Sequence, residues 1–200
     1  MYLYCDIVKV GNEVLRVKCT DVELPLDEET KKTLVSMHEY LEHGYDDEFV
    51  KTHDIHPGVG LASPQIGKPK RMLAIMAYDE KGAFHDYIMV NPKVLSYSVD
   101  MTYLESGEGC LSVPETHKGY IHRHRKIKVQ TYLYDYKHDK LTLETLQLKG
   151  YLSIVFQHEF DHLNGVLFFD HINKADPFFI PENSKPVKFK GSEEETDNEQ

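Results

Sequence analysis

Residues 150–163, GYLSIVFQHEFDHL, are the stretch of sequence that decides the fold. The apolar face of this stretch is formed by Leu152, Ile154, Val155 and Phe156. Such a broad apolar face at helical spacing is typical of a helix in a protein core rather than one at the surface. The stretch therefore predicts a mostly buried helix toward the C-terminal end of the folded chain.

The same stretch carries the sequence HEFDH, in which two histidines are separated by three residues. On a helix His158 and His162 lie one above the other, so both imidazoles can bind one cation. Glu159 leaves the helix beside the first histidine, where it can act as a general base toward water. Burying these groups without partners would be costly, so the sequence predicts a metal site on this helix.

A hydrolytic metal site needs a third protein ligand and one open position. The pattern HExxHxxGxxH fits through Gly165, but its last position is Phe168. His171 or Glu182 could supply the ligand instead, as in a zincin-type metallopeptidase. The upstream candidate is Cys110 in the segment EGCLS, because a cysteine in a Gly-flanked turn can approach a metal closely. The residues alone do not decide between these candidates for the third ligand. They also allow a structural metal-binding domain, in which four protein ligands leave no open position.

The rest of the chain predicts strands between two helices. Residues 26–43 have the periodicity of an amphipathic helix, with Asp27 as its N-cap. Strand-like patterns cover residues 71–78, 87–90, 97–104, 126–136 and 141–148. No strand–helix–strand alternation occurs, so we expect an α+β fold. Mainly antiparallel sheets should pack around the buried C-terminal metal-binding helix, with the N-terminal helix beside them.

The charge of the chain excludes some partners. There are 23 Lys and Arg against 33 Asp and Glu, which gives a formal net charge of −10. This balance argues against direct nucleic-acid binding, which needs clustered positive charge. The longest apolar run, residues 72–78, is far short of the roughly 20 residues of a membrane span. Because the N-terminal residues also lack a signal-peptide pattern, we expect a cytoplasmic protein without membrane contact.

The length predicts one catalytic domain over residues 1–180, followed by a polar acidic tail over residues 181–200. The last nine residues, SEEETDNEQ, include five acids and no apolar residue. Such a composition predicts disorder at the end of the tail. The three cysteines cannot close a disulfide framework, which suits a reducing compartment.

Three segments, taken together and in order, carry a resemblance to a known family. They are GVGLASPQ at residues 58–65, EGCLS at residues 108–112 and QHEFDHLNG at residues 157–165. Jointly they resemble peptide deformylase, the enzyme that removes the formyl group from N-formylmethionyl nascent chains. The resemblance runs from about residue 6 to residue 176. It is greatest to the longer subclass typical of Gram-positive bacteria and their wall-less relatives.

The resemblance implies a role for each matched residue of the metal site. Cys110, His158 and His162 match the three metal ligands, and Glu159 matches the general acid/base. The implied cofactor is one divalent metal ion, with Fe²⁺ native and Zn²⁺, Ni²⁺ or Co²⁺ able to substitute.

The resemblance also implies how the substrate is held. Gln65 and the backbone N–H of Leu111 match the donors to the formyl oxygen, as catalytic groups. The matched substrate-binding positions are the backbone at Val59, Gly60 and Gly109 and the methionine-pocket residues Tyr151, Ile154 and Val155.

Further expectations follow from the resemblance. Arg123 should pair with Glu108 and hold the loop of the cysteine. Ser63 stands where the family usually has alanine, and its hydroxyl should find a backbone partner. The implied partners are N-formylmethionyl nascent peptides and a transient ribosome contact, and we expect a monomer. The chain after Asp176 matches no family segment from which a role could be assigned.

Overall fold

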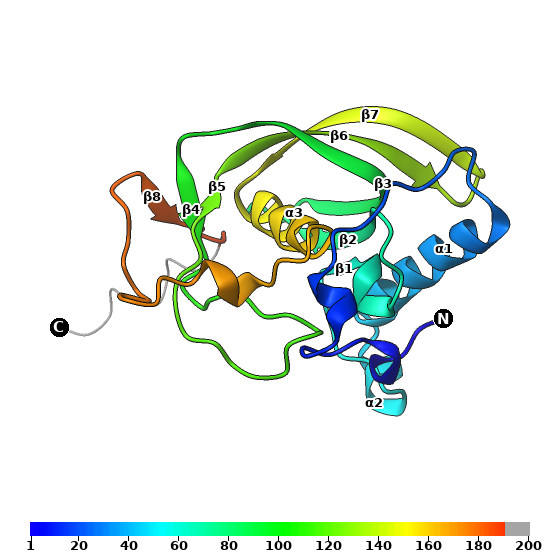
Figure 1. Ribbon diagram of the computed structural model, residues 1–200, viewed down its shortest axis with the longest axis horizontal. Coiled ribbons are helices and arrows are strands. Elements are labelled where there is room, and N and C mark those ends of the chain that lie inside the picture. Colours follow the sequence, from blue (N-terminus) through cyan, green and yellow to red (C-terminus); the bar gives the residue numbers. More distant parts are fainter. Residues whose placement is uncertain (191–200) are drawn as a thin grey trace.

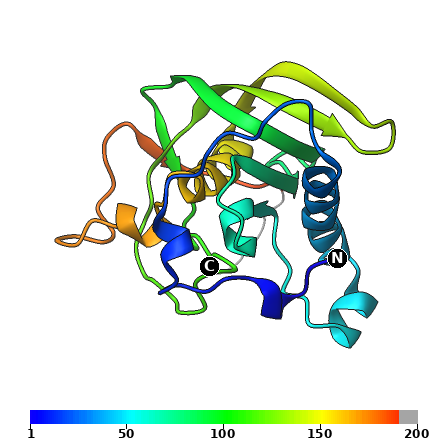
Figure 2. The same cartoon turned by 45° about the vertical axis from the view of Figure 1, so that its right-hand side comes forward.

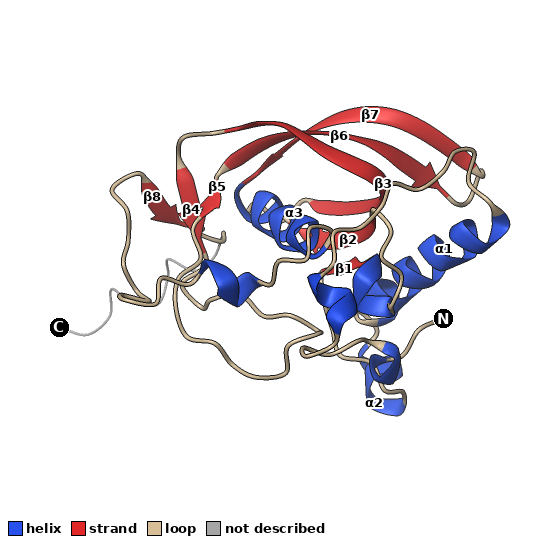
Figure 3. Cartoon of the chain, in the orientation of Figure 1, coloured by secondary structure: helices blue, strands red, loops and turns tan. Residues whose placement is uncertain are grey.

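Residues 1–190, the part of the chain that the computed structural model describes, contain three α-helices and eight strands (Figures 1 and 3). The helices are α1 (Glu28–His43), α2 (Asp47–Thr52) and α3 (Gly150–His162). The strands are β1 (Gly60–Ala62), β2 (Met72–Tyr78), β3 (Phe84–Tyr97), β4 (Met101–Tyr103), β5 (Arg123–His124), β6 (Lys126–Asp135), β7 (Lys140–Lys149) and β8 (Ser184–Pro186).

The strands form two sheets of unequal size. The larger sheet is antiparallel throughout, in the order β1-β2-β3-β6-β7, so β1 is an edge strand. The smaller sheet has the order β5-β4-β8, in which β4 and β8 run parallel. The large sheet curves over α3, while the small sheet stands at the other side of that helix (Figure 1). This arrangement confirms the expected α+β class.

Strand β2 is buried on both faces because a helix covers each of them. Leu73 and Ile75 belong to the core cluster around α3, whereas Ala74 and Met76 belong to the cluster around α1. Side chains alternate between the faces of a strand, so only a continuously apolar segment such as MLAIMA satisfies both helices. The side-on view shows the larger sheet lying between α1 and α3 (Figure 2).

Both predicted helices are present. Asp27 caps α1 as expected, since its side chain accepts a hydrogen bond from the N–H of Thr30 at 2.7 Å. α3 is buried over most of its length, including Phe156, which is fully buried. The two histidines predicted to bind metal are therefore held on a rigid element inside the core.

The strand boundaries differ from the sequence prediction between residues 84 and 104. β3 is one strand of 14 residues that contains Asn91 at a φ of 51° and two register shifts against β6. The side chain of Asn91 bonds both backbone groups of Val22, which stabilises this irregularity. A bulge interrupts the alternation of side chains, so the pattern predicted only residues 87–90 of this strand. The next predicted strand, residues 97–104, contains β4 but is longer than it.

Two short elements were also missed. β1 lies inside residues 57–67, where the glycines and prolines are typical of a loop, and α2 lies in the polar and acidic residues that follow α1. Ser63 follows β1, and its hydroxyl bonds the carbonyl of Lys70, which is the backbone partner expected for it.

Within residues 1–190 no helix is both long enough and apolar enough to cross a membrane. The tail predicted over residues 181–200 is in part folded, because it contains β8, which pairs with β4. Its end, predicted to be disordered, falls in residues 191–200, which lie outside the described residues.

Candidate active site

Three potential metal ligands from distant parts of the chain meet at α3. The ligand atoms of Cys110, His158 and His162 all lie within 4.8 Å of one another. The Cys110 Sγ is 3.2 Å from the His162 Nε2. α3 supplies the two imidazoles one turn apart, and the turn between Cys110 and Val113 carries the thiol toward them. In residues 1–190 this is the one group of three or more such residues placed to hold a metal ion.

A buried carboxylate fixes the orientation of the first histidine. The Glu108 Oε2 lies 2.9 Å from the Nδ1 of His158, and Arg123 bonds both oxygens of the same carboxylate at 2.8 and 2.9 Å. Burial alone would raise the pKa of Glu108, but Arg123 and His158 outweigh it and lower the pKa to about 2. The carboxylate therefore stays charged, holds Nδ1 and leaves Nε2 of His158 free for a metal. The expected Arg123–Glu108 pair is present.

The downstream candidates for the third ligand are engaged elsewhere or remote. The Nε2 of His171 lies 2.7 Å from a carboxylate oxygen of Asp161, which in turn pairs with Arg123. Glu182 is exposed near the C-terminal strand and does not belong to the ligand group. The structure thus brings Cys110, rather than His171 or Glu182, to the two histidines.

The donor set fits a divalent transition metal. One thiolate and two imidazoles are ligands that Zn²⁺ and Fe²⁺ accept, and three protein ligands leave a position open for substrate or water. The Nδ1 of His162 is buried and has no hydrogen-bond partner among residues 1–190. Its other nitrogen, Nε2, lies 3.2 Å from the Sγ of Cys110, so one cation could bind both atoms.

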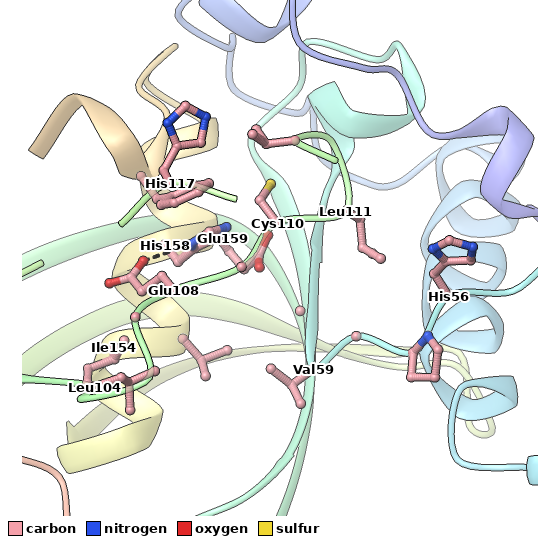
Figure 4. A pocket seen from close by; sticks show the side chains of 18 of the residues that line it. His56, Val59, Leu104, Glu108, Cys110, Leu111, His117, Ile154, His158 and Glu159 are labelled. Atoms are coloured by element: carbon pink, nitrogen blue, oxygen red, sulfur yellow. Dashed lines mark hydrogen bonds and ion pairs between the residues drawn. The ribbon is translucent and has the colours of Figure 1, made fainter. Parts of the chain in front are cut away.

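Glu159 lies next to the ligand group without belonging to it (Figure 4). The residue is 4% exposed, and its Oε2 is buried with no hydrogen-bond partner within residues 1–190. Burial raises the pKa of Glu159 to about 7, which suits a group that must both take and give a proton near neutral pH. A cation bound beside it would lower that pKa again.

Gly60 makes room for this carboxylate. A Cβ atom added to Gly60 would lie 2.3 Å from the Oε1 of Glu159, well inside van der Waals contact. Glycine is therefore required here by the close approach of a side chain to the β1 backbone.

We expect Gly60→Ala to displace the Glu159 carboxylate and to lower kcat by roughly 10²-fold, the scale of general acid–base catalysis. Metal content should stay at the wild-type level, because the three atoms nearest to the added methyl group all belong to Glu159 and not to a ligand residue. Formate release and metal analysis on the same preparation check this result. An alanine variant with wild-type kcat would show that the carboxylate has room to move without consequence.

The amide of Gln65 is aimed at the cysteine. Its Oε1 accepts a hydrogen bond from the N–H of Ala62 at 2.8 Å, which fixes the rotation of the amide. The Nε2 then lies 3.3 Å from the Oγ of Ser112 and 3.6 Å from the Sγ of Cys110. On the neighbouring loop, the N–H of Leu111 has no acceptor among the hydrogen bonds of residues 1–190. Two donors are thus available beside the ligand group.

β1 presents a free backbone edge next to these donors. Among residues 1–190 no strand pairs with its outer side, and the carbonyl of Val59 is already bonded by the N–H of Met76 at 2.9 Å. Gly60 is paired with Ile75. Because successive residues of a strand turn their backbone groups to opposite sides, the N–H and C=O of Gly60 point to the open edge.

A cavity of about 700 Å³ joins these groups. Apart from His162, every site residue expected from the sequence lines it: Val59, Gly60, Gln65, Gly109, Cys110, Leu111, Tyr151, Ile154, Val155, His158 and Glu159. His162 is 1% exposed. In Figure 4 the cysteine and Glu159 occupy the middle of the view, with Ile154 toward one end of the cavity and His56 at the other.

Sequence reasoning missed some of the cavity walls. Tyr4 and His56 line the cavity and stack on each other at 3.6 Å between ring centroids. His117 lines another part of the wall and stacks on Phe169. These aromatic contacts join segments far apart in the chain, and no local pattern in the sequence indicates them.

Comparisons with known proteins agree with this geometry. Residues 4–178 match the family described as polypeptide deformylase. The chain is 43% identical over 183 residues to peptide deformylase 2 of Bacillus cereus, which covers 92% of this chain and 97% of that protein. It is 45% identical over 187 residues to peptide deformylase 2 of Bacillus subtilis, with the same coverage. The crystal structure of peptide deformylase from Thermotoga maritima superposes with a TM-score of 0.63 at 36% identity, over 86% of this chain and 99% of that one.

Proposed function

Because this chain belongs to the polypeptide deformylase family and removes the formyl group from the N-terminus of nascent peptides, we propose that Cys110, His158 and His162 hold its divalent metal ion. The observation that carries this proposal is the approach of their ligand atoms to within 4.8 Å beside an open cavity. We propose Fe²⁺ as the native ion, with Zn²⁺, Ni²⁺ or Co²⁺ able to replace it. We propose residues 1–180 as the single catalytic domain, to which β8 adds a strand from the segment that follows. When bound, the ion polarises the formyl carbonyl and makes water more acidic.

Glu159 is proposed as the general acid/base. Its carboxylate takes a proton from the attacking water and later passes this proton to the nitrogen of the leaving amine. The position of Glu159 supports this role, because its Oε2 is buried beside the ligand group, has no partner within residues 1–190 and is therefore available to bond the attacking water.

Gln65 and the Leu111 N–H are proposed to stabilise the oxyanion that forms from the formyl oxygen. Both donors lie beside the cysteine, and the amide of Gln65 is held in place by Ala62. Donors that are oriented before the reaction stabilise a developing charge without reorganisation, typically by about 3–4 kcal/mol for each donor.

The peptide is proposed to bind as an added strand along the free edge of β1. Gly60 offers both of its backbone groups on that edge, and Gly109 lies across the cavity. Val59 forms the adjoining wall, since its carbonyl is bonded to β2. The methionine side chain would enter the part of the cavity lined by Tyr151, Ile154 and Val155 of α3.

The setting of the reaction follows from its substrate. A formylated nascent chain is available where proteins are made, so we propose a cytoplasmic location and a transient contact with the ribosome. A monomer is proposed, because one chain supplies every residue of the site described above.

The oxyanion role of Gln65 is tested with two substitutions. We expect Gln65→Leu to lower kcat and kcat/KM together by about 10²-fold or more, with KM little changed. Gln65→Glu should be at least as inactive, because it brings negative charge to where negative charge must grow. Steady-state formate release from formyl-Met peptides gives both constants.

Gln65→Glu also serves as the control for loop structure. The glutamate keeps an oxygen to accept from the N–H of Ala62, so the turn after β1 is retained while the donor is lost. If Gln65 only ties the loop, Gln65→Glu should keep a near wild-type kcat and Gln65→Leu should raise KM and lower Tm. That pattern would refute the oxyanion role.

A further inference from the structure

A three-residue segment near the N-terminus joins the two loops that carry the oxyanion donors. The N–H of Val8 donates to the carbonyl of Gln65 at 2.7 Å, and the N–H of Val10 donates to the carbonyl of Ser112 at 2.8 Å. Residues 8–10, which we name the strap, therefore bridge the turn after β1 and the loop after Cys110. The blue N-terminal segment passes beside the turn that follows β1 in both views (Figures 1 and 2).

The side chain of Lys9, in the middle of the strap, reaches the donor loop itself. Its Nζ donates to the carbonyl of Leu111 at 3.3 Å and to the carbonyl of Tyr4 at 3.1 Å. The same ammonium lies 3.3 Å from the centroid of the Tyr4 ring. A charged donor bonds a carbonyl more strongly than a neutral one does, so Lys9 stabilises the position of the Leu111 carbonyl.

We propose that Lys9 is a positioning residue for the reaction, which holds the Leu111 carbonyl and so keeps the N–H of the same residue aimed at the formyl oxygen. The proposal rests on the oxyanion role assigned above to the Leu111 N–H. Lys9 does not line the cavity, so it acts through the residues that it bonds.

The physical reason lies in how a loop residue can move. The Leu111 N–H shares a peptide plane with the Cys110 carbonyl, which the N–H of Val113 bonds at 3.0 Å, and the Ser112 carbonyl two planes further on is held by Val10. The plane between them carries the Leu111 carbonyl, and Lys9 is its donor. Freeing this carbonyl should broaden the orientations of the N–H and weaken transition-state stabilisation more than substrate binding.

The test compares Lys9→Met with Lys9→Arg and with the control Lys68→Met. Methionine keeps the length of the side chain but cannot donate, whereas arginine can still donate to both carbonyls. Lys68 is a suitable control, because its ammonium bonds Glu29 at 2.8 Å and Thr33 at 3.1 Å and does not line the cavity. The readouts are kcat and KM for formyl-Met peptides, metal content, and hydrogen–deuterium exchange of the loop that contains Leu111.

We expect Lys9→Met to lower kcat about tenfold, to leave KM within about twofold and to keep full metal content. The amide of Leu111 should exchange faster in this variant only. Lys9→Arg should restore kcat to within about threefold of the wild type, and Lys68→Met should behave as the wild type. Should Lys9→Met not fold, Lys9→Gln replaces it with the same expected direction, because its shorter chain cannot reach both carbonyls.

Two results would overturn the proposal. One is an unchanged kcat in Lys9→Met with only a lower Tm, which would make the lysine a purely structural contact. The other is a raised KM at constant kcat, which would mean that Lys9 acts on the cavity wall through Tyr4. Failure of the underlying function looks different: Gln65→Glu would then also keep its kcat, whereas an inactive Gln65→Glu beside a normal Lys9→Met rejects the role of Lys9 alone.

Discussion

Glu159→Gln is expected to lower formate release by roughly 10²-fold or more while metal content stays near the wild-type level. The amide has the size of the carboxyl group but cannot take a proton from water or return one to the amine. Glu159 is almost fully buried beside the ligands, and its Oε2 has no partner within residues 1–190, so little in the structure depends on its charge. The loss should therefore appear in kcat rather than in folding.

The control for this variant is the metal itself. Glu159→Gln and the wild type should bind the same amount of Zn²⁺ or Co²⁺ per chain, measured on the samples used for kinetics. Tm should also be equal or higher, because burying a neutral amide costs less than burying a carboxylate. Full activity in the metal-loaded variant would refute the acid/base role.

Cys110→Ala is expected to abolish high-affinity metal binding and with it all measurable formate release. The variant keeps both histidines, but two ligands one turn apart hold a divalent ion much more weakly than three. The thiol is partly exposed at the cavity, where it can lose its proton to a bound cation. Metal content per chain, determined after dialysis against buffer without metal, measures the effect.

Cys5→Ala provides the matched control for this loss. Cys5 is an exposed free cysteine that does not line the cavity, so its removal should change neither metal content nor turnover. Cys19 is a poorer control because it is buried in the core, where burial raises the pKa of its thiol to about 11. A Cys110→Ala protein that keeps one tightly bound metal ion would exclude the cysteine as a ligand.

Some of this fold could be predicted from the sequence because the signals are local. The period of residues 150–163 and the cap at Asp27 arise within a few residues, and both helices begin and end close to their predicted positions. The long strand β3 was not predictable in the same way, because Asn91 is held by Val22 from a distant segment. An irregularity stabilised by tertiary contacts leaves no periodic signature.

The candidate site likewise has a part that local sequence predicts and a part that depends on tertiary structure. The pair His158 and His162 is visible in the sequence, since helical spacing alone places both on one face. The third ligand was left open among Cys110, His171 and Glu182, because chain separation says nothing about distance in space. Resemblance to a family indicated the cysteine, and the fold shows it 3.2 Å from His162.

The contacts of the strap could not be predicted from the sequence either, because they join segments far apart in the chain. Two of its contacts are made by the backbone of Val8 and Val10, which any residue with an N–H could supply. Lys9 itself resembles many surface lysines in sequence. Only the fold shows that its ammonium reaches the carbonyl of a residue 102 positions away.

The metal ligands are the central claim of this account, and X-ray absorption of the Zn²⁺-loaded protein at the zinc edge tests them most directly. Cys110, His158 and His162 predict one sulfur at about 2.3 Å and two imidazole nitrogens at about 2.0–2.1 Å, with one lighter atom in the open position. The sulfur contribution should be unchanged in Cys5→Ala. A first shell made only of nitrogen and oxygen would contradict the account, because it would exclude Cys110 and return the third ligand to His171 or Glu182.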